Sequence, residues 1–359
     1  MSRLPGFLRL DSATTTRAAV EAQHQLFAQL NNMERQRAQA AFTPSSPFSV
    51  LHAVQDSTRE QNRYTDILPY RHSQVLVGNN SSTAISPQNF INANRISAPA
   101  KLRTSLPDNW RSYIATQAPL PQTQSRFWRM ILEQNVHIIV CLTAVSPERS
   151  RRAQKAERYW PLAGETDEFE KDIKVRNLET TNHSDQVVAY HQFEVWYAAS
   201  DEPRRLVLLV HYQGWPDHGV PQTSNDIRGM LYRIRAWKQD QEQRLSLHGT
   251  KLDLGPTVVH CSAGCGRTGT FCVVDTALAV LEHTGYPHLK SRGTDNHSQT
   301  EYAQQSTLYR AATDDQYNWQ GNRDIIFESL DSFREERMMM VQTAPQFSFC
   351  YQTVRDMCQ

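Results

Sequence analysis

The sequence predicts an α/β (α+β) protein built on a highly twisted mixed β-sheet that is flanked by helices. Short runs rich in β-branched and aromatic residues, which are typical of strands, alternate with segments whose apolar residues recur at helical spacing. The strand-like runs are residues 137–142, 192–198, 205–212 and 257–261. The helical patterns are residues 125–135, 225–241 and 268–283. Such alternation is typical of a sheet that buries its faces under helices.

Composition narrows the class of protein. The chain has 359 residues, of which 39% are hydrophobic and 21% charged, as in a globular protein with a sizeable core. The net charge of +1 argues against general binding to nucleic acid or to a membrane surface. We find no apolar signal segment and no apolar run of about 18 residues that could span a bilayer.

The six cysteines are too few for a disulfide scaffold in a chain of this length, and none has the spacing of a zinc site. We therefore expect reduced thiols in a reducing compartment. We further expect no metal or organic cofactor and a protein of the cytoplasm or the nucleus, whose oligomeric state stays open with a monomer favoured.

The N-terminal segment, residues 14–41, is rich in Ala, Gln, Glu and Arg and has few apolar positions. It predicts a largely exposed helix that ends before the helix-breaking residues 43–47. Two roles stay open: a solvated helix that packs by one edge, and a helix that docks a partner. We expect residues 1–44 to form a helical extension and residues 45–359 to form the main domain.

Two features follow near the C-terminus. Residues 284–322 are polar and lack periodicity, which predicts an inserted surface loop. Helical patterns resume in residues 323–359, and we expect two helices that break near Ala344 and Pro345.

The most informative stretch is "VVHCSAGCGRTGTF", residues 258–271, because it predicts a strand, a Gly-rich turn and a helix in succession. This layout directs backbone N–H groups and a helix N-terminus at an anion. Arg267 adds a planar, permanently charged fork that suits two phosphate oxygens. The turn is formed by Ser262, Ala263, Gly264, Cys265 and Gly266. Hereafter we call residues 261–267 the cradle.

Cys261 lies at the base of the cradle, where a nucleotide-binding loop would have no thiol. A free thiol of pKa about 8.5 is mostly protonated at neutral pH, but a helix N-terminus and a nearby cation lower that value. We therefore expect Cys261 to be a nucleophile beneath a bound phosphoryl group. The alternative is a buried cysteine before an ordinary glycine turn.

The motif "HCSAGCGRTG" resembles the signature of the cysteine-dependent protein tyrosine phosphatases, in particular their tyrosine-specific, non-receptor-like catalytic domains. Other motifs that are similar to the landmarks of this family follow in order: "NRYTD" (62–66), "FINAN" (90–94), "TQAPLPQT" (116–123), "YWP" (159–161), "WPDHGVP" (215–221) and "MVQTAPQF" (340–347). The resemblance implies the fold of that family, hydrolysis of protein phosphotyrosine through a phosphocysteine, and a role in signal transduction.

The resemblance also implies an acid. The phenol of tyrosine has a pKa near about 10, so it needs a proton to leave at neutral pH. Asp217 is the candidate general acid, on a loop that Trp215 and Pro216 stiffen and that Gly214 and Gly219 could hinge.

Further residues receive roles by the same resemblance. Gln342 would hold the attacking water, with Gln346 on the second glutamine position. Thr268 could donate its hydroxyl to the departing thiolate or simply cap the helix, and His260 would order the cradle from behind.

Substrate recognition and the framework are implied too. Tyr64 would form a wall against the substrate ring, and Asp66 would hold backbone amides of the peptide. Lys155 and Glu148 match the charged residues of a mobile loop. The structural framework arginines are Arg334 and Arg337.

Two alternative functions remain, together with a separate hypothesis about Cys265. A broader phosphatase would act on phosphoserine or phosphoinositides, although the cradle has no lysine and no second arginine for a lipid headgroup. A binding module would capture phosphotyrosine without turnover, but Cys261, Asp217 and Arg267 are all present. Redox pairing of Cys261 with Cys265 would need a strained disulfide, so packing is the favoured role of Cys265.

Overall fold

The computed structural model describes residues 6–8, 12–78, 85–107, 110, 112–146, 155–170, 172–183, 187–200, 203–217, 219–246, 254–284 and 323–359. The polar insertion predicted at 284–322 lies, apart from Thr284, outside the described residues. Glu148 lies outside them as well.

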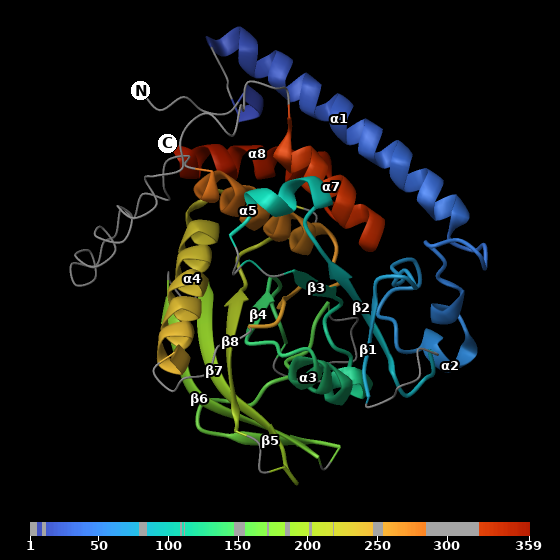
Figure 1. The fold of residues 1–359 in the computed structure, drawn as a ribbon, viewed down its shortest axis with the longest axis vertical. Coiled ribbons are helices and arrows are strands. Elements are labelled where there is room, and N and C mark those ends of the chain that lie inside the picture. Colours follow the sequence, from blue (N-terminus) through green and yellow to red (C-terminus); the bar gives the residue numbers. More distant parts are fainter. Residues whose placement is uncertain are drawn as a thin grey trace, which may run out of the picture.

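A nine-stranded mixed sheet forms the centre of the described part of the chain, in the order β1-β2-β3-β9-β4-β8-β7-β6-β5 (Figure 1). Strands β3, β9, β4 and β8 are parallel to their neighbours in that group, and every other pair is antiparallel. The strands are β1 (Gln74–Leu76), β2 (Phe90–Ile96), β3 (Tyr113–Thr116), β4 (Ile138–Cys141), β5 (Thr166–Phe169), β6 (Ile173–His183), β7 (Val188–Tyr197), β8 (Arg205–Tyr212) and β9 (Thr257–His260).

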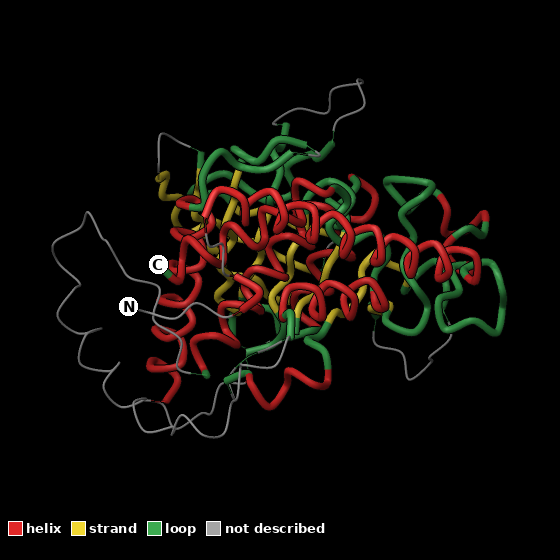
Figure 2. The backbone as a smooth tube through the Cα atoms, turned by 90° about the horizontal axis from the view of Figure 1, so that it is seen from above, coloured by secondary structure: helices red, strands yellow, loops and turns green. Residues whose placement is uncertain are grey.

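Helices cover both faces of the sheet, as the sequence predicts. Four helices share one large core with the sheet, namely α4 (Asn225–Ser246), α5 (Gly266–His283), α7 (Ile325–Glu336) and α8 (Ala344–Cys358). The helix α3 (Gln124–Glu133) covers the opposite face through a second core. In Figure 2, where the molecule is seen from above, red helices pass in front of the yellow strands. The remaining helical segments are α1 (Ser12–Ala40), α2 (Asp56–Arg59) and the short 3₁₀ helices Gly6–Leu8, Leu51–Ala53, Ala100–Ser105 and Pro121–Thr123.

The predicted strands and helices are confirmed within a few residues at most ends, although the strand predicted at 192–198 already begins at Val188. The two C-terminal helices are also present, but the break lies at residues 337–343 and not at Pro345. Pro345 belongs to the first turn of α8, where its missing N–H and fixed φ are tolerated. Helix α5 begins at Gly266, so the last residues of the cradle are already helical.

The N-terminal helix α1 lies along the outside of α7 and α8 (Figure 1). One edge is buried, with Phe27 stacked on Phe347 of α8 at 5.4 Å between ring centroids. Val20 is exposed to solvent. The predicted helix that packs by one edge is therefore confirmed.

None of the helices that the structure describes is both long enough and apolar enough to cross a membrane.

Candidate active site

The cradle lies at the carboxyl end of β9, in the middle of the parallel strands. The last residue of β9, His260, pairs with Thr116 of β3 on one side and with Cys141 of β4 on the other. The chain then turns through Cys261 into α5. Since the carboxyl ends of parallel strands meet at one edge of a sheet, this arrangement brings loops from several strands to the thiol.

Glycine is required at Gly264, which has φ of 73°. A Cβ there would also collide with the Thr116 carbonyl. The buried Arg337 guanidinium donates to the Ala263 and Gly264 carbonyl oxygens at 2.9 and 2.8 Å. Because the peptide group is planar and trans, carbonyls held on the Arg337 side direct the next N–H groups to the opposite side.

The Cys261 thiol is buried, and its pKa is lowered. Burial by itself would raise the pKa. The Arg267 guanidinium, the Thr268 hydroxyl and the N–H groups of Thr268 and Cys265 outweigh that effect. The buried Thr268 hydroxyl makes no hydrogen bond to any other described residue, so it is available to the sulfur. The charge and the hydrogen-bond donors that the sequence predicted around the Cys261 sulfur therefore lie where they can stabilise a thiolate.

His260 lies directly behind the thiol. Burial, above all, lowers its pKa to about 4, so the ring is neutral at pH 7. Its Nδ1–H donates to the Cys261 carbonyl at 3.0 Å, since a carbonyl only accepts. Its Nε2 therefore accepts from the Tyr159 hydroxyl at 2.6 Å. These bonds fix the backbone of Cys261 against the core.

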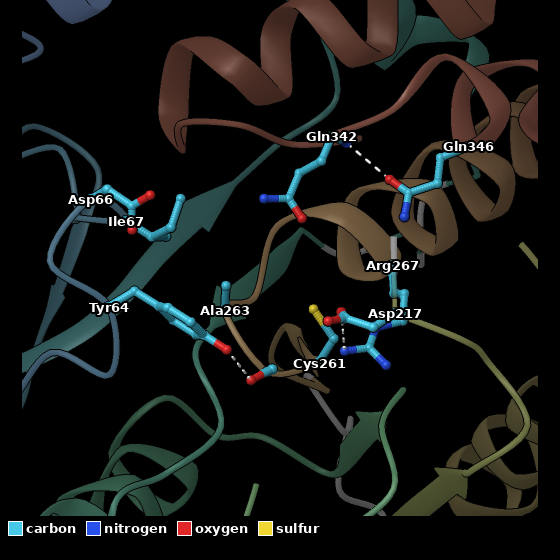
Figure 3. A pocket seen from close by; sticks show the side chains of 10 residues that line it. Tyr64, Asp66, Ile67, Asp217, Cys261, Ala263, Arg267, Gln342 and Gln346 are labelled. Carbon is cyan, nitrogen blue, oxygen red and sulfur yellow. Dashed lines mark hydrogen bonds and ion pairs between the residues drawn. The ribbon is translucent and has the colours of Figure 1, made fainter. Parts of the chain in front are cut away.

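Arg267 connects the cradle to the loop of Asp217. Its buried guanidinium donates to the Asp217 carboxylate at 3.1 Å (Figure 3). It also donates to the Trp215 carbonyl at 3.1 Å. Lys155 forms an ion pair with the same carboxylate. Asp217 therefore lies over the cradle, between two cations.

The loop that carries Asp217 makes a hydrogen bond within itself and packs closely against neighbouring side chains. The Trp215 indole donates to the Gly219 carbonyl at 3.1 Å. Gly214 and Gly219 both lie too close to other side chains to accept a Cβ, Gly214 against Val187 and Gly219 against Pro216.

Tyr64 faces the cradle from the segment before β1 (Figure 3). Its hydroxyl is 2.7 Å from the Ser262 hydroxyl, which donates to the Lys155 carbonyl. Ser262 thus links three segments that are far apart in the sequence. Sequence reasoning assigned Ser262 only a place in the cradle, because nothing in the motif shows which side chain its hydroxyl meets.

Gln342 and Gln346 approach from the loop between α7 and α8 and from the start of α8. The Gln342 N–H donates to the Gln346 side-chain oxygen at 2.9 Å (Figure 3). The Gln346 amide donates to the Gly219 carbonyl at 3.4 Å, on the loop of Asp217. Both glutamines therefore reach the same cavity as Asp217.

One cavity joins most of the predicted site residues. It is lined by Tyr64, Asp66, Ile67, Asp217, Cys261, Ser262, Ala263, Arg267, Gln342 and Gln346 (Figure 3). The sequence analysis missed Ile67, for which the only signal is an apolar residue directly after "NRYTD".

The other predicted site residues lie around this cavity without lining it. Gly264, Gly266, Thr268 and His260 form the frame of the cradle, and Lys155 holds Asp217. Cys265 is buried at the start of α5, and burial raises its pKa to about 12. Its thiol approaches the Ala263 carbonyl at 3.7 Å, which favours packing as its role.

All six cysteines are free and buried. Within the part of the chain that the structure covers, no three His, Cys, Asp or Glu side chains gather as they would around a metal ion.

Comparison with known proteins decides the family. The model of the protein-tyrosine phosphatase family matches residues 58–319, which include β1 to β9 and the cradle. The chain belongs to the protein-tyrosine phosphatase family. The predicted fold of that family is thereby confirmed, and the chain carries a hydrolase domain of this class.

Individual relatives agree with this assignment. Receptor-type tyrosine-protein phosphatase F of Rattus norvegicus is 34% identical over 275 residues, which cover 76% of this chain and 12% of the relative. Receptor-type tyrosine-protein phosphatase S of Gallus gallus is 32% identical over 80% of this chain and 17% of its own length. Tyrosine-protein phosphatase 3 of Dictyostelium discoideum is 30% identical over 85% of this chain and 25% of its own length. The chain thus spans a quarter or less of these relatives.

The relatives change one expectation. Receptor-type phosphatases are prominent among them, so the comparisons do not support the narrower assignment to a non-receptor-like domain. The family match also ends before α7 and α8, although the structure places Gln342 and Gln346 in the same cavity as Cys261.

Proposed function

We propose that this domain hydrolyses phosphotyrosine on proteins through a phosphocysteine on Cys261. The observation that carries the proposal is the lowered pKa of a buried thiol beneath a cavity that Arg267 and Asp217 also line. A thiolate is a strong nucleophile, and its position at the base of an anion-binding turn suits attack on phosphorus.

In the first half-reaction the Cys261 sulfur attacks phosphorus while the bond to the tyrosine oxygen breaks. The Arg267 fork and the N–H groups of the cradle stabilise the charge on the phosphoryl oxygens. Asp217 gives its proton to the phenolic oxygen that leaves. The position of Asp217 over the cradle supports this role, because a bound phosphate replaces the carboxylate at Arg267 and leaves Asp217 able to carry the proton.

In the second half-reaction water attacks phosphorus and the S–P bond breaks. Gln342 orients the water, Asp217 accepts its proton, and phosphate leaves. Thr268 donates a hydrogen bond to the departing thiolate, for which its otherwise unbonded hydroxyl is suited. Gln346 holds Gln342 through the bond to its N–H.

Selectivity for tyrosine follows from the walls of the cavity. The Tyr64 ring and the Ile67 side chain offer apolar contact to an aromatic ring, and Asp66 lies at the rim for peptide amides. A phosphoserine would reach the thiolate less well past these walls. The turn residues Ser262 to Gly266 offer no cation for a phosphoinositide headgroup.

We further propose that residues 45–359 are the catalytic domain, that it acts in signal transduction as a monomer, and that it works in the cytoplasm or nucleus. Six free, buried thiols and a thiolate nucleophile support a reducing compartment.

The test is hydrolysis of three matched substrates by the purified chain: a phosphotyrosine peptide, the same peptide with phosphoserine, and a soluble phosphoinositide. Phosphate release should be fastest for phosphotyrosine by at least about a hundredfold in kcat/KM. Phosphotyrosine that binds without any release of phosphate would show a binding module, and equal rates would show a broader phosphatase.

A further inference from the structure

Gln342 follows a strained stretch of backbone between α7 and α8. Met339 and Val341 have φ of 60° and 57°, in the left-handed region that favours glycine. For the β-branched Val341 this conformation is a genuine outlier. Such backbone persists only where the surroundings hold it in place. The position of Gln342 therefore depends on what contacts residues 338–341, which we call the glutamine-loop base.

Helix α5 and α7 hold one side of this base. Arg334 of α7 is buried and donates to the Met340 and Val341 carbonyls at 2.8 and 2.7 Å. The Val341 N–H donates to the Cys265 carbonyl at 3.3 Å. Gly269 of α5 is so close to Met340 and Val341 that a Cβ would collide with their backbone.

The N-terminal helix α1 holds the other side. The Met339 N–H donates to the Glu34 carboxylate at 3.1 Å. The Arg334 guanidinium donates to the Asn31 side chain at 3.0 Å and lies 4.0 Å from the second Glu34 oxygen. The central guanidinium carbon of Arg334 (Cζ) also lies over the Phe27 ring, 5.3 Å from the ring centroid.

The burial of Glu34 is costly, which makes its position informative. Only 6% of the residue is exposed, and burial raises the pKa of the carboxyl against the effects of Arg334 and the Met339 N–H. One carboxylate oxygen has no hydrogen-bond partner among the described residues. A simple docking contact would be stronger with an apolar side chain there.

We propose that Glu34 and Asn31 of α1 are positioning residues for Gln342, so that the N-terminal helix supports catalysis from outside the catalytic domain proposed at residues 45–359. They act through Met339 and Arg334, which fix the strained glutamine-loop base. This inference rests on the proposed function, because Gln342 matters only for attack of water on the phosphocysteine. The helix lies outside the residues that the family model matches, 58–319, so no family motif points to it.

The proposal predicts a selective kinetic effect. Loss of the Glu34 carboxylate should let the glutamine-loop base relax and should misplace Gln342. Formation of the phosphocysteine uses Cys261, Arg267 and Asp217 and should keep its rate. Hydrolysis of the phosphocysteine should slow, so that the covalent intermediate accumulates.

The experiment measures both steps with p-nitrophenyl phosphate and the full chain, by a rapid-mixing burst of nitrophenol and by acid quenching of the phosphoenzyme. For Glu34→Ala we expect hydrolysis about tenfold slower, a burst rate within about twofold of the original, and a larger trapped fraction. Glu34→Gln keeps an oxygen for the Met339 N–H and should recover most of the hydrolysis rate. Asn31→Ala should slow hydrolysis by about threefold.

Arg37→Ala is the matched control. Arg37 lies one turn further along α1, is as buried as Glu34, and binds Asp331 of α7 at 2.6 Å without a hydrogen bond to the glutamine-loop base. Its charge also favours the Glu34 carboxylate, so Arg37→Ala should lower the melting temperature and change the ratio of the two rates by much less than Glu34→Ala does. If Glu34→Ala does not fold, Asn31→Ala and Glu34→Gln carry the test.

Two results would overturn the inference, and they differ. Equal slowing of both steps in Glu34→Ala, or a ratio of rates like that of Arg37→Ala, would reduce Glu34 to a docking contact while the proposed function stands. Absence of any turnover by the unsubstituted chain would remove the proposed function and the inference with it.

Discussion

The cradle and the loop of Asp217 face each other across one cavity, yet they are built in opposite ways. The cradle is buried, with Cys261, Ser262 and Arg267 all nearly inaccessible to solvent, as is the adjacent Thr268. Its backbone is held by buried bonds from Arg337, and its glycines Gly264 and Gly266 are packed so closely that a Cβ would collide with neighbouring atoms. The Asp217 loop exposes Pro216 and Asp217, and the Asp217 carboxylate is held by two ion pairs, one to the buried Arg267 and one to the exposed Lys155.

The difference teaches which catalytic task each region is suited for. Stabilisation of charge works best with dipoles that are fixed before the reaction, which a buried, over-determined turn provides. Delivery of a proton requires a group that can approach and leave a substrate of finite size, which suits a loop held by a few weak contacts. Arg267 belongs to both regions, since it contacts the thiolate field and the Asp217 carboxylate.

The strongest test of the cradle is Cys261→Ser. A hydroxyl in the same field has a much higher pKa than a thiol and stays protonated, so turnover should fall by more than about 10⁴-fold. Binding of a phosphotyrosine peptide, measured by calorimetry, should persist because Arg267 and the N–H groups remain. Substantial turnover in this variant would mean that another group is the nucleophile.

The corresponding test of the loop is Asp217→Ala. Loss of the proton donor should lower kcat by about 10³-fold. KM should not rise, because the carboxylate also occupies Arg267 and its removal frees that cation for phosphate. The substitution should therefore trap phosphotyrosine proteins from solution. A near-normal kcat in a pH series would show that Asp217 is not the acid.

The third test concerns the Cys261 thiol itself, whose pKa is lowered from its ordinary value. Alkylation by iodoacetamide should stay fast down to that lowered pKa and then fall about tenfold per pH unit. Arg267→Ala should shift this profile to higher pH, because the Arg267 guanidinium is the group that lowers the pKa of the thiol most. An unshifted profile would assign the effect to the Thr268 hydroxyl and the backbone N–H groups.

The same shift has a consequence for stability. A thiol with a lowered pKa in the folded state stabilises the fold fully above its unfolded pKa, and loses that contribution as pH falls through the folded pKa. The difference in free energy of unfolding between the original chain and Cys261→Ser should therefore shrink towards acid pH. Urea titrations at several pH values measure it.

The two regions also differ in how much the sequence could predict. The cradle is a contiguous segment, so Cys261, Gly264 and Arg267 were placed correctly relative to one another by local geometry alone. The hydroxyl of Ser262 meets Tyr64, which is 198 positions away, and Arg334 meets Asn31 across 303 positions. A single sequence carries no signal for such contacts.

Strands β5 and β6 were missed for a related physical reason. The residues of β5 alternate between exposed and half-buried, and the second half of β6 is largely exposed on both faces. Their residues are therefore mostly polar and lack the apolar enrichment that marks a strand. Strand β5 pairs with β6, and β6 pairs with β7 through a register that extends to His183 and Val188. This pairing is what makes them strands. Tertiary pairing here outweighs local propensity.

The substitution with the smallest expected effect, at Lys155, is the most direct test of how the Asp217 loop differs from the cradle. Lys155 pairs with Asp217 while more than half of the Lys155 side chain is exposed, at 54%. An exposed ion pair contributes little, so Lys155→Ala should lower kcat by only about two- to fivefold. The loss should fade in high salt, which screens the pair in the original chain as well. A buried bond of the cradle should show no such salt dependence. If Lys155→Ala instead lowered kcat as much as Asp217→Ala does, the acid loop would be as rigidly built as the cradle, and the division of tasks between the two regions would be wrong.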